Sequence, residues 1–203
     1  MIIKTFVEPP IDNNNYLIID ENSKEAALID CSYYDENILI ELKRQNAILK
    51  YILLTHGHFD HISGLNNFSE NVQVLMHFAD KEWVEQVNNY LPMLNMPSMK
   101  IPRIDKYIDN DDIINLGDLK IKVIHTPGHT QGGVCFYVDG YLFSGDTIFK
   151  ESVGRCDLPG GDFNQIVKSI EGKIFTLPDN TIIYPGHGKS TTVAWEKVHN
   201  SYL

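Results

Sequence analysis

The chain has 203 residues, of which 43% are hydrophobic and 22% charged, an ordinary composition for a globular protein with a substantial core. Its formal net charge of −10 argues against nucleic acids and membrane surfaces as partners, because both attract basic faces. No apolar run reaches the roughly 20 residues that cross a bilayer, and charge and proline at residues 8–10 come too early for a secretory signal. The three cysteines are widely spaced, so we expect a reduced, cytoplasmic protein, and its oligomeric state stays open.

Short apolar runs separated by polar turns predict the elements of the first half of the chain. We expect strands at 2–7, 16–19, 26–29, 51–54 and 72–76. Apolar residues at helical spacing predict helices at 35–47 and 79–89. The run at 51–54 is continuously apolar, which is typical of a strand that is covered on both faces.

The second half has the same character. We predict strands at 119–124, 134–138, 141–143 and 181–184, and helices at 162–170 and 192–199. Strands and helices interleave in both halves, which favours two sheets stacked face to face with helices outside. We expect residues 1–203 to form a single domain of this kind.

The segment 91–107 interrupts the pattern. Prolines recur in it at five-residue spacing and block regular pairing, while methionines between them offer an adaptable apolar surface. Two interpretations fit this composition, a lid over a functional site and a connector packed on the edge of the core. We favour the connector.

Five of the eight histidines and two aspartates lie at spacings typical of a site for two metal ions. Each lies on a predicted turn after an apolar run. Imidazole and carboxylate groups are ligands that zinc and ferrous iron accept. The candidate ligands are His56, His58, Asp60, His61, His129, Asp146 and His187.

The first run of ligands predicts two directions of side chains. His56 and His58 are two residues apart, so at the extended end of a strand their rings project to the same side. Gly57 between them leaves room for the ions. Asp60 and His61 follow after the chain has turned, and they are therefore expected to face a second ion.

The later ligands complete this arrangement. His129 would complete the first set, His187 the second, and Asp146 is the natural carboxylate to bridge both ions. Two ions about 3.5–4 Å apart can share a water, lower its pKa and hold it as hydroxide at neutral pH. The remaining histidines are interpreted as hydrogen-bonded core side chains: His77, His125 and His199.

Four motifs carry a resemblance to a known family. THGHFDH, TPGHT, SGDT and YPGHG occur in this order, and the whole chain resembles the metallo-β-lactamase superfamily. The resemblance implies a four-layer αβ/βα sandwich with the ions at one edge between the sheets. It also implies one ion on His56, His58 and His129. The other ion would bind Asp60, His61 and His187, with Asp146 bridging.

Within this superfamily the chain is most similar to the glyoxalase II group. Zinc β-lactamases usually carry Cys or His in place of Asp146 and are exported. The flavodiiron branch has Glu where this chain has His58, and nucleases carry an additional domain or arm. The segments shared with glyoxalase II are 15–18, 27–30, 143–149 and 154–155.

Arg155 occupies the place of a basic residue that contacts the thiol carrier in that group. The resemblance therefore implies a substrate-binding role for Arg155. A salt bridge to Asp157 or Asp146 that supports the loop fits equally well. Glyoxalase II proper also has a C-terminal helical domain for glutathione, and this chain is too short to contain it.

The sequence therefore predicts a binuclear hydrolase of thioesters of the S-lactoylglutathione type, acting through a metal-bridging hydroxide. We assign catalytic roles to Asp60 and Asp146, and we expect two divalent ions, zinc first, with iron or manganese possible. The expected partner is a small-molecule thioester. An alternative enzyme is a mononuclear iron persulfide dioxygenase that uses the same pocket. An alternative of another class is a metal-binding module without catalysis.

Overall fold

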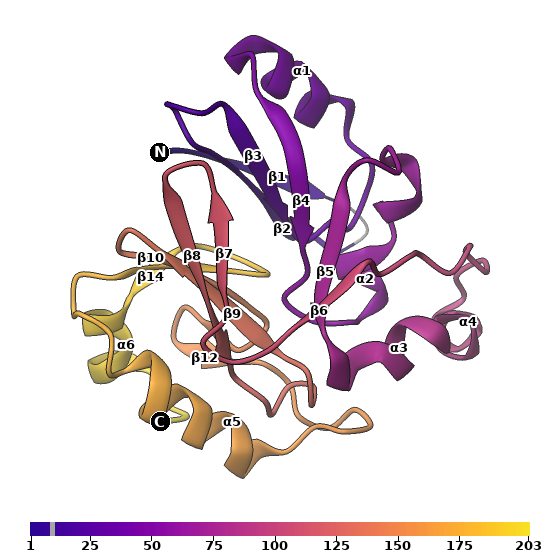
Figure 1. Cartoon of the computed structure of the whole chain (residues 1–203). Coiled ribbons are helices and arrows are strands. Elements are labelled where there is room, and N and C mark those ends of the chain that lie inside the picture. Colours follow the sequence, from indigo (N-terminus) through magenta and orange to yellow (C-terminus); the bar gives the residue numbers. More distant parts are fainter. Residues whose placement is uncertain (9–10) are drawn as a thin grey trace.

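The computed structural model describes residues 1–8 and 11–203, so the proline pair that argued against a secretory signal lies outside the described residues. Within this part of the chain, two six-stranded sheets stack face to face, and helices cover the outer face of each (Figure 1). The predicted αβ/βα sandwich is thereby confirmed. None of the helices in the described ranges is both long and apolar enough to cross a membrane.

The first sheet contains the strands of the first half of the chain, in sequence order. β1 and β2 pair antiparallel, as do β2 and β3, and the remaining neighbours pair parallel. The strands are β1 (Ile2–Glu8), β2 (Asn13–Ile19), β3 (Glu25–Ile29), β4 (Ile48–Leu53), β5 (Gln73–His77) and β6 (Lys106–Ile108).

The second sheet has the order β14-β13-β10-β9-β8-β7. Its neighbours pair antiparallel, apart from the parallel pair of β10 and β13. The strands are β7 (Ile113–Leu116), β8 (Leu119–His125), β9 (Val134–Val138), β10 (Tyr141–Gly145), β13 (Ile182–Pro185) and β14 (Thr191–Thr192). A small hairpin of β11 (Ile148–Phe149) and β12 (Ser152–Val153) follows β10.

Helices cover both outer faces. The first half carries α1 (Glu36–Gln45), α2 (Phe59–Ile62), α3 (Lys81–Glu85) and α4 (Val87–Tyr90), with the 3₁₀ turns η1 (Leu65–Asn67), η2 (Phe78–Asp80) and η3 (Leu91–Leu94). The second half carries α5 (Phe163–Ser169), the π-helical turn η4 (Ile170–Ile174) and α6 (Val193–His199). Asp35, Asp162 and Thr192 cap the starts of α1, α5 and α6 with their side chains.

Buried apolar side chains form three clusters in the described part of the chain, one between each pair of layers. Successive residues of β2 alternate between them: Leu17 and Ile19 face the helices, whereas Tyr16 and Ile18 face the second sheet. The third cluster lies between the second sheet and α5, where Ile166 is fully buried. Every residue of β2 is buried because both of its faces are covered.

The predicted helix at 79–89 is replaced by the 3₁₀ turn η2 and the two short helices α3 and α4. The break falls at Gln86, whose backbone angles (φ −103°, ψ 13°) lie outside the helical region. The strands β6, β7 and β14 escaped sequence analysis because each has at most four residues. Such runs are too short to show a period of two.

The segment 91–107 is held against the rest of the protein. Met96 and Met99 pack on the first core cluster. The Asn88 side chain donates to the Met99 carbonyl and accepts from the Met99 amide, both at 2.9 Å. Met93, by contrast, is 82% exposed. These contacts support the connector interpretation.

Candidate metal centre

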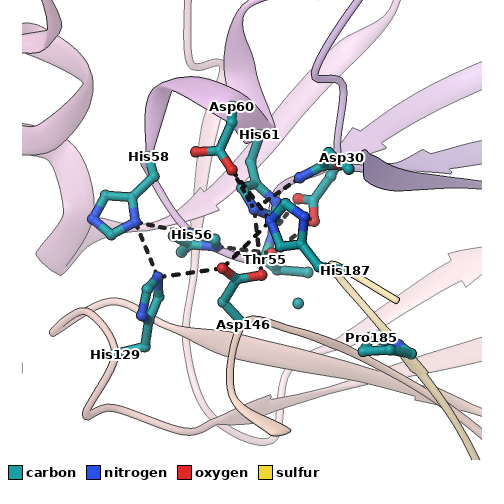
Figure 2. A network of polar contacts seen from close by, with 12 residues as sticks. Asp30, Thr55, His56, His58, Asp60, His61, His129, Asp146, Pro185 and His187 are labelled. Carbon is teal, nitrogen blue, oxygen red and sulfur yellow. Dashed lines mark hydrogen bonds and ion pairs between the residues drawn. The ribbon is translucent and has the colours of Figure 1, made fainter. Parts of the chain in front are cut away.

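The candidate ligands gather at one edge of the sandwich because each follows the carboxyl end of a strand. The first run comes after β4, and His129, Asp146 and His187 follow β8, β10 and β13 respectively. Figure 2 shows their side chains converging between the two sheets. His58 is the N-cap of α2, so the chain turns into a helix directly after it. This turn directs Asp60 and His61 as expected from the sequence.

Three imidazoles form the first group of candidate ligands. His56 Nε2 lies 3.1 Å from His58 Nδ1, and His129 Nε2 lies 3.0 Å from the same atom. All three residues are buried, with exposed fractions of 2%, 7% and 4%. Three nitrogens this close can share one ion, because zinc binds imidazole at about 2.0–2.1 Å.

The second group consists of Asp60, His61 and His187. The carboxylate Oδ2 of Asp60 lies 3.3 Å from His187 Nε2 and 3.4 Å from His61 Nε2. His61 is completely buried, whereas the His187 side chain is 25% exposed. His187 therefore lies on the open side of the centre.

Asp146 lies between the two groups. Its Oδ1 is 3.4 Å from His61 Nε2, and its Oδ2 is 3.6 Å from His129 Nε2. Among the described residues, the buried Oδ1 finds no hydrogen-bond partner. A Cβ at position 186 would meet this oxygen at 2.2 Å, so Gly186 is required for the close approach.

A buried hydrogen-bond chain orients two of the histidines. Asp30 accepts from His61 Nδ1 at 2.8 Å and from the hydroxyl of Thr55 at 2.8 Å (Figure 2). The Thr55 hydroxyl in turn accepts from His56 Nδ1 at 3.1 Å. The proton of each ring therefore faces Asp30 or Thr55, and the lone pair of each Nε2 points into the centre.

Backbone carbonyls orient the later histidines. His129 Nδ1 donates to the carbonyl of Arg155 at 2.7 Å, and His187 Nδ1 donates to that of Ile11 at 3.2 Å. Since a carbonyl only accepts, Nε2 of each ring is left with its lone pair. These contacts could not be predicted from the sequence, because every residue has a backbone carbonyl and its identity does not show which carbonyl accepts.

Two further side chains contact the centre without a sequence signal. Asn13 Nδ2 lies 2.9 Å from His61 Nε2. The ring of Trp83 lies 4.4 Å from that of His58, at 88°. The buried Nε2 of His58 has no hydrogen-bond partner among the described residues.

Burial keeps two imidazoles of the first group, His56 and His58, neutral. It lowers the pKa of His56 well below the usual value, and the neighbouring His61 and His58 add to the effect. Burial and the neighbouring His129 lower the pKa of His58 to about 3. A neutral imidazole is the form that binds a metal, so these ligands need not lose a proton at neutral pH.

The two histidines of the second group are protonated more readily. Burial disfavours the cation at His61, but the carboxylates of Asp30, Asp60 and Asp146 outweigh it and raise the pKa well above its usual value. At His187, burial lowers the pKa, but the hydrogen bond with Asp60 and the charges of Asp146 and Asp60 together outweigh it and raise the pKa. Buried carboxylates facing imidazoles with free lone pairs form a donor set that suits divalent cations such as zinc and iron.

Arg155 makes the salt bridge that was one of its two predicted roles. Its guanidinium donates to both carboxylate oxygens of Asp157, at 2.7 and 2.8 Å, and the side chain is 61% exposed. Its carbonyl orients His129, as described above. Substrate binding by Arg155 stays a prediction.

The three remaining histidines were predicted to be core side chains, and this prediction is wrong. His199 is exposed and stacks on Trp195, whereas His77 and His125 are partly buried at strand ends. Their rings stack at 4.2 Å and 11° beside Asp109. Because ring lone pairs lie in the ring plane, two parallel stacked rings cannot direct theirs at one ion in this arrangement.

The fold and the two adjacent His/Asp groups define a metalloprotein of the αβ/βα sandwich class. Residues 9–187 match the family described as "Metallo-beta-lactamase superfamily". The chain belongs to this superfamily of metal-dependent hydrolases, as its motifs predicted.

Two relatives cover nearly the whole chain. The probable metallo-hydrolase YqgX of Bacillus subtilis is 33% identical over 96% of this chain and 93% of its own length. The hydroxyacylglutathione hydrolase GloC of Haemophilus influenzae is 30% identical over 93% of this chain and 92% of its own length.

Solved structures give a matching picture. BLEG-1, described as a B3 metallo-beta-lactamase, has a TM-score of 0.89 and 34% identity over 100% of this chain and 99% of its own. TTHA1623, in a di-iron-bound form, has a TM-score of 0.88 and 31% identity over 98% and 100%. ETHE1 from Myxococcus xanthus has a TM-score of 0.81 and 27% identity over 99% and 84%.

Proposed function

We propose that the protein is a binuclear metal-dependent hydrolase of thioesters, of the hydroxyacylglutathione type. The observation that carries the proposal is the position of Asp146 between two groups of ligands, one with three imidazoles and one with Asp60, His61 and His187. The GloC relative supports the choice of thioester. We propose that residues 1–203 act as one domain.

The residues of the centre have distinct roles in this proposal. His56, His58 and His129 would hold one ion and Asp60, His61 and His187 the other, and Asp146 lies where it could serve both. When bound, two adjacent divalent ions supply a water of lowered pKa and polarise the substrate carbonyl. Zinc is our first choice, and the di-iron form of TTHA1623 keeps iron open.

The leaving group explains why the ligands suffice for catalysis. A thiol has a pKa of about 8.5, so it departs as thiolate without a strong acid to protonate it. We propose that Arg155, whose carbonyl adjoins His129, contacts the carrier once its guanidinium exchanges Asp157 for the substrate.

Metal content and thioester hydrolysis, measured on the same preparation, test the proposal. We expect two ions per chain and turnover of S-lactoylglutathione. Asp146→Ala should lower turnover by more than about 100-fold, beyond the 10–100-fold typical of losing an outer hydrogen-bond partner of a ligand. Full turnover with full metal content in this variant would refute the assignment. One iron per chain with oxygen uptake on a glutathione persulfide would select a dioxygenase instead.

β-Lactam hydrolysis is a second candidate, because the BLEG-1 lactamase is 34% identical with a TM-score of 0.89. Asp146 itself argues against a lactamase, because zinc β-lactamases usually carry Cys or His at this place. To separate the two activities, hydrolysis of penicillin, cephalosporin and S-lactoylglutathione is measured with the same preparation of metal-loaded protein. A larger kcat/KM for the β-lactam would replace the thioester proposal.

A further inference from the structure

Asp80 is a completely buried carboxylate that is not a candidate ligand. It follows β5, in the turn η2, and its exposed fraction is 0%. Its Oδ2 accepts from the Gly57 amide at 2.9 Å and from the Thr130 hydroxyl at 2.8 Å. Its Oδ1 accepts from the Gly132 amide at 2.6 Å. Since all of these partners are donors, the acceptor-only carboxylate satisfies them.

These donors lie in the two loops that carry the first imidazole group. Gly57 is the residue between His56 and His58, and Thr130 directly follows His129. One loop follows a strand of the first sheet and the other follows a strand of the second. Asp80 therefore connects segments that are distant in the sequence, since Gly57 lies 23 residues before it and Thr130 lies 50 residues after it. This carboxylate therefore links the loop of His56 and His58 directly to the loop of His129.

The two glycines explain how Asp80 fits so closely. A Cβ at position 57 would meet the Asp80 carbonyl oxygen at 2.9 Å, and a Cβ at position 132 would meet the Asp80 carboxyl carbon at 2.6 Å. Any larger residue at either place would push the carboxylate away. The glycine of the HGH motif thus serves the contact with Asp80 as well as the space for the ions.

The helix that begins beside Asp80 reaches the same imidazole group. Trp83, in α3, lies with its ring perpendicular to that of His58, whose Nε2 has no hydrogen-bond partner in the described ranges. The segment from Asp80 to Trp83 therefore contacts the loop of His56 and His58 from two directions.

We propose that Asp80 is a positioning residue for the first metal ion, which it serves by fixing the two ligand loops in register. The inference rests on the proposed metal centre. We expect Asp80 to affect the affinity for one ion in addition to stability, because two of its contacts, Gly57 and Thr130, directly adjoin candidate ligands and the third, Gly132, lies three residues from His129.

Zinc affinity in a His187→Ala background tests this proposal, because that background removes a ligand of the second group and leaves the first as the main site. We expect Asp80→Ala to weaken zinc binding, measured by competition with a chromophoric chelator, by about 10–100-fold. The visible spectrum of the Co²⁺-substituted protein should change as well, since the imidazole geometry changes.

Asp20→Ala is the matched control. Asp20 is 3% exposed and accepts from the Ser23 hydroxyl at 2.7 Å and from the Asp118 amide at 3.1 Å, joining two turns at the opposite end of the strands. We expect this variant to lower Tm and to keep zinc affinity and the Co²⁺ spectrum. An equal loss of zinc affinity in Asp20→Ala, or none in Asp80→Ala, would overturn the proposal.

Two conservative variants of Thr130 test the same contact if Asp80→Ala does not fold. Thr130→Val removes one donor at nearly constant shape and should weaken zinc binding, whereas Thr130→Ser keeps the hydroxyl and should restore it. Equal zinc affinities in the pair would count against the role of Asp80. A wild-type protein that binds zinc but hydrolyses no thioester would refute the proposed function alone, whereas one that binds no metal would refute both.

Discussion

At the scale of single residues, Asp30 connects the two groups of ligands. It accepts directly from His61 and, through Thr55, orients His56. His56 belongs to the first group and His61 to the second, so a change at Asp30 alters the orientation of a ligand in each group. The residue has a positive φ of 58°, a conformation that asparagine also tolerates.

Asp30→Asn should therefore weaken the binding of both ions while leaving the backbone in place. Oδ2 accepts from both His61 and the Thr55 hydroxyl, and Oδ1 accepts from the Thr55 amide at 2.8 Å, so the amide nitrogen of asparagine faces a donor at either place. We expect a loss of about 10–100-fold in metal affinity, measured by chelator competition. Asp20→Asn is the control at the far end of the strands, and equal affinities in the two variants would contradict the role of Asp30.

At the scale of elements, α5 supports the loop that carries His129. The Asp162 amide donates to the Gly128 carbonyl at 2.8 Å, and the Ser169 hydroxyl donates to the Pro127 carbonyl at 2.7 Å. Gly128 has a φ of +140°, and a Cβ there would meet the Ile166 backbone nitrogen at 2.3 Å. The loop can reach its place only with glycine at this position.

Gly128→Ala should displace the loop from α5, which lowers both Tm and metal affinity. Gly140→Ala separates the causes, because Gly140 also has a positive φ (+84°) but its Cβ would meet nothing within 4 Å. We expect the control to lose about 1–2 kcal/mol of stability from backbone strain and to keep its metal affinity. Thermal unfolding and zinc titration of both variants make the comparison; a metal affinity unchanged in Gly128→Ala would contradict the coupling to α5.

At the scale of the whole molecule, the centre joins the two halves of the sandwich. Four candidate ligands follow β4 in the first sheet, and the other three follow strands of the second sheet. Ions bound here would link the sheets at one edge. Metal binding to the folded state alone must then raise the free energy of unfolding.

Removal of the ions should therefore lower Tm. At a free ion concentration of 100 times Kd, each site contributes about 2.7 kcal/mol, or roughly 5–10 °C for a chain of this size. The effect should be smaller at pH 6 than at pH 8. The raised pKa of His61 and His187 means that a proton must leave before an ion binds, and protonation increases as pH falls. Unfolding scans with and without chelator at both pH values measure this, and a larger effect at pH 6 would contradict it.

The amino-acid sequence by itself determined the fold class and the candidate ligands. The continuous apolar run at 51–54 indicates a strand that ends buried between two layers, and a ligand directly after a strand depends on local spacing alone. His58 could be predicted to share a side with His56, and His61 to turn away, because both follow from backbone periodicity.

Only the tertiary structure decided what orients those ligands. The Ile11 carbonyl that accepts from His187 lies 176 residues away in the sequence, and Asp80 reaches Thr130 across 50 residues. Contacts of this kind depend on how the two sheets stack. The position of a carbonyl or an aspartate in the sequence does not predict which distant residue it will contact. The sequence thus specifies which atoms can bind an ion, whereas packing between the sheets specifies where their lone pairs point.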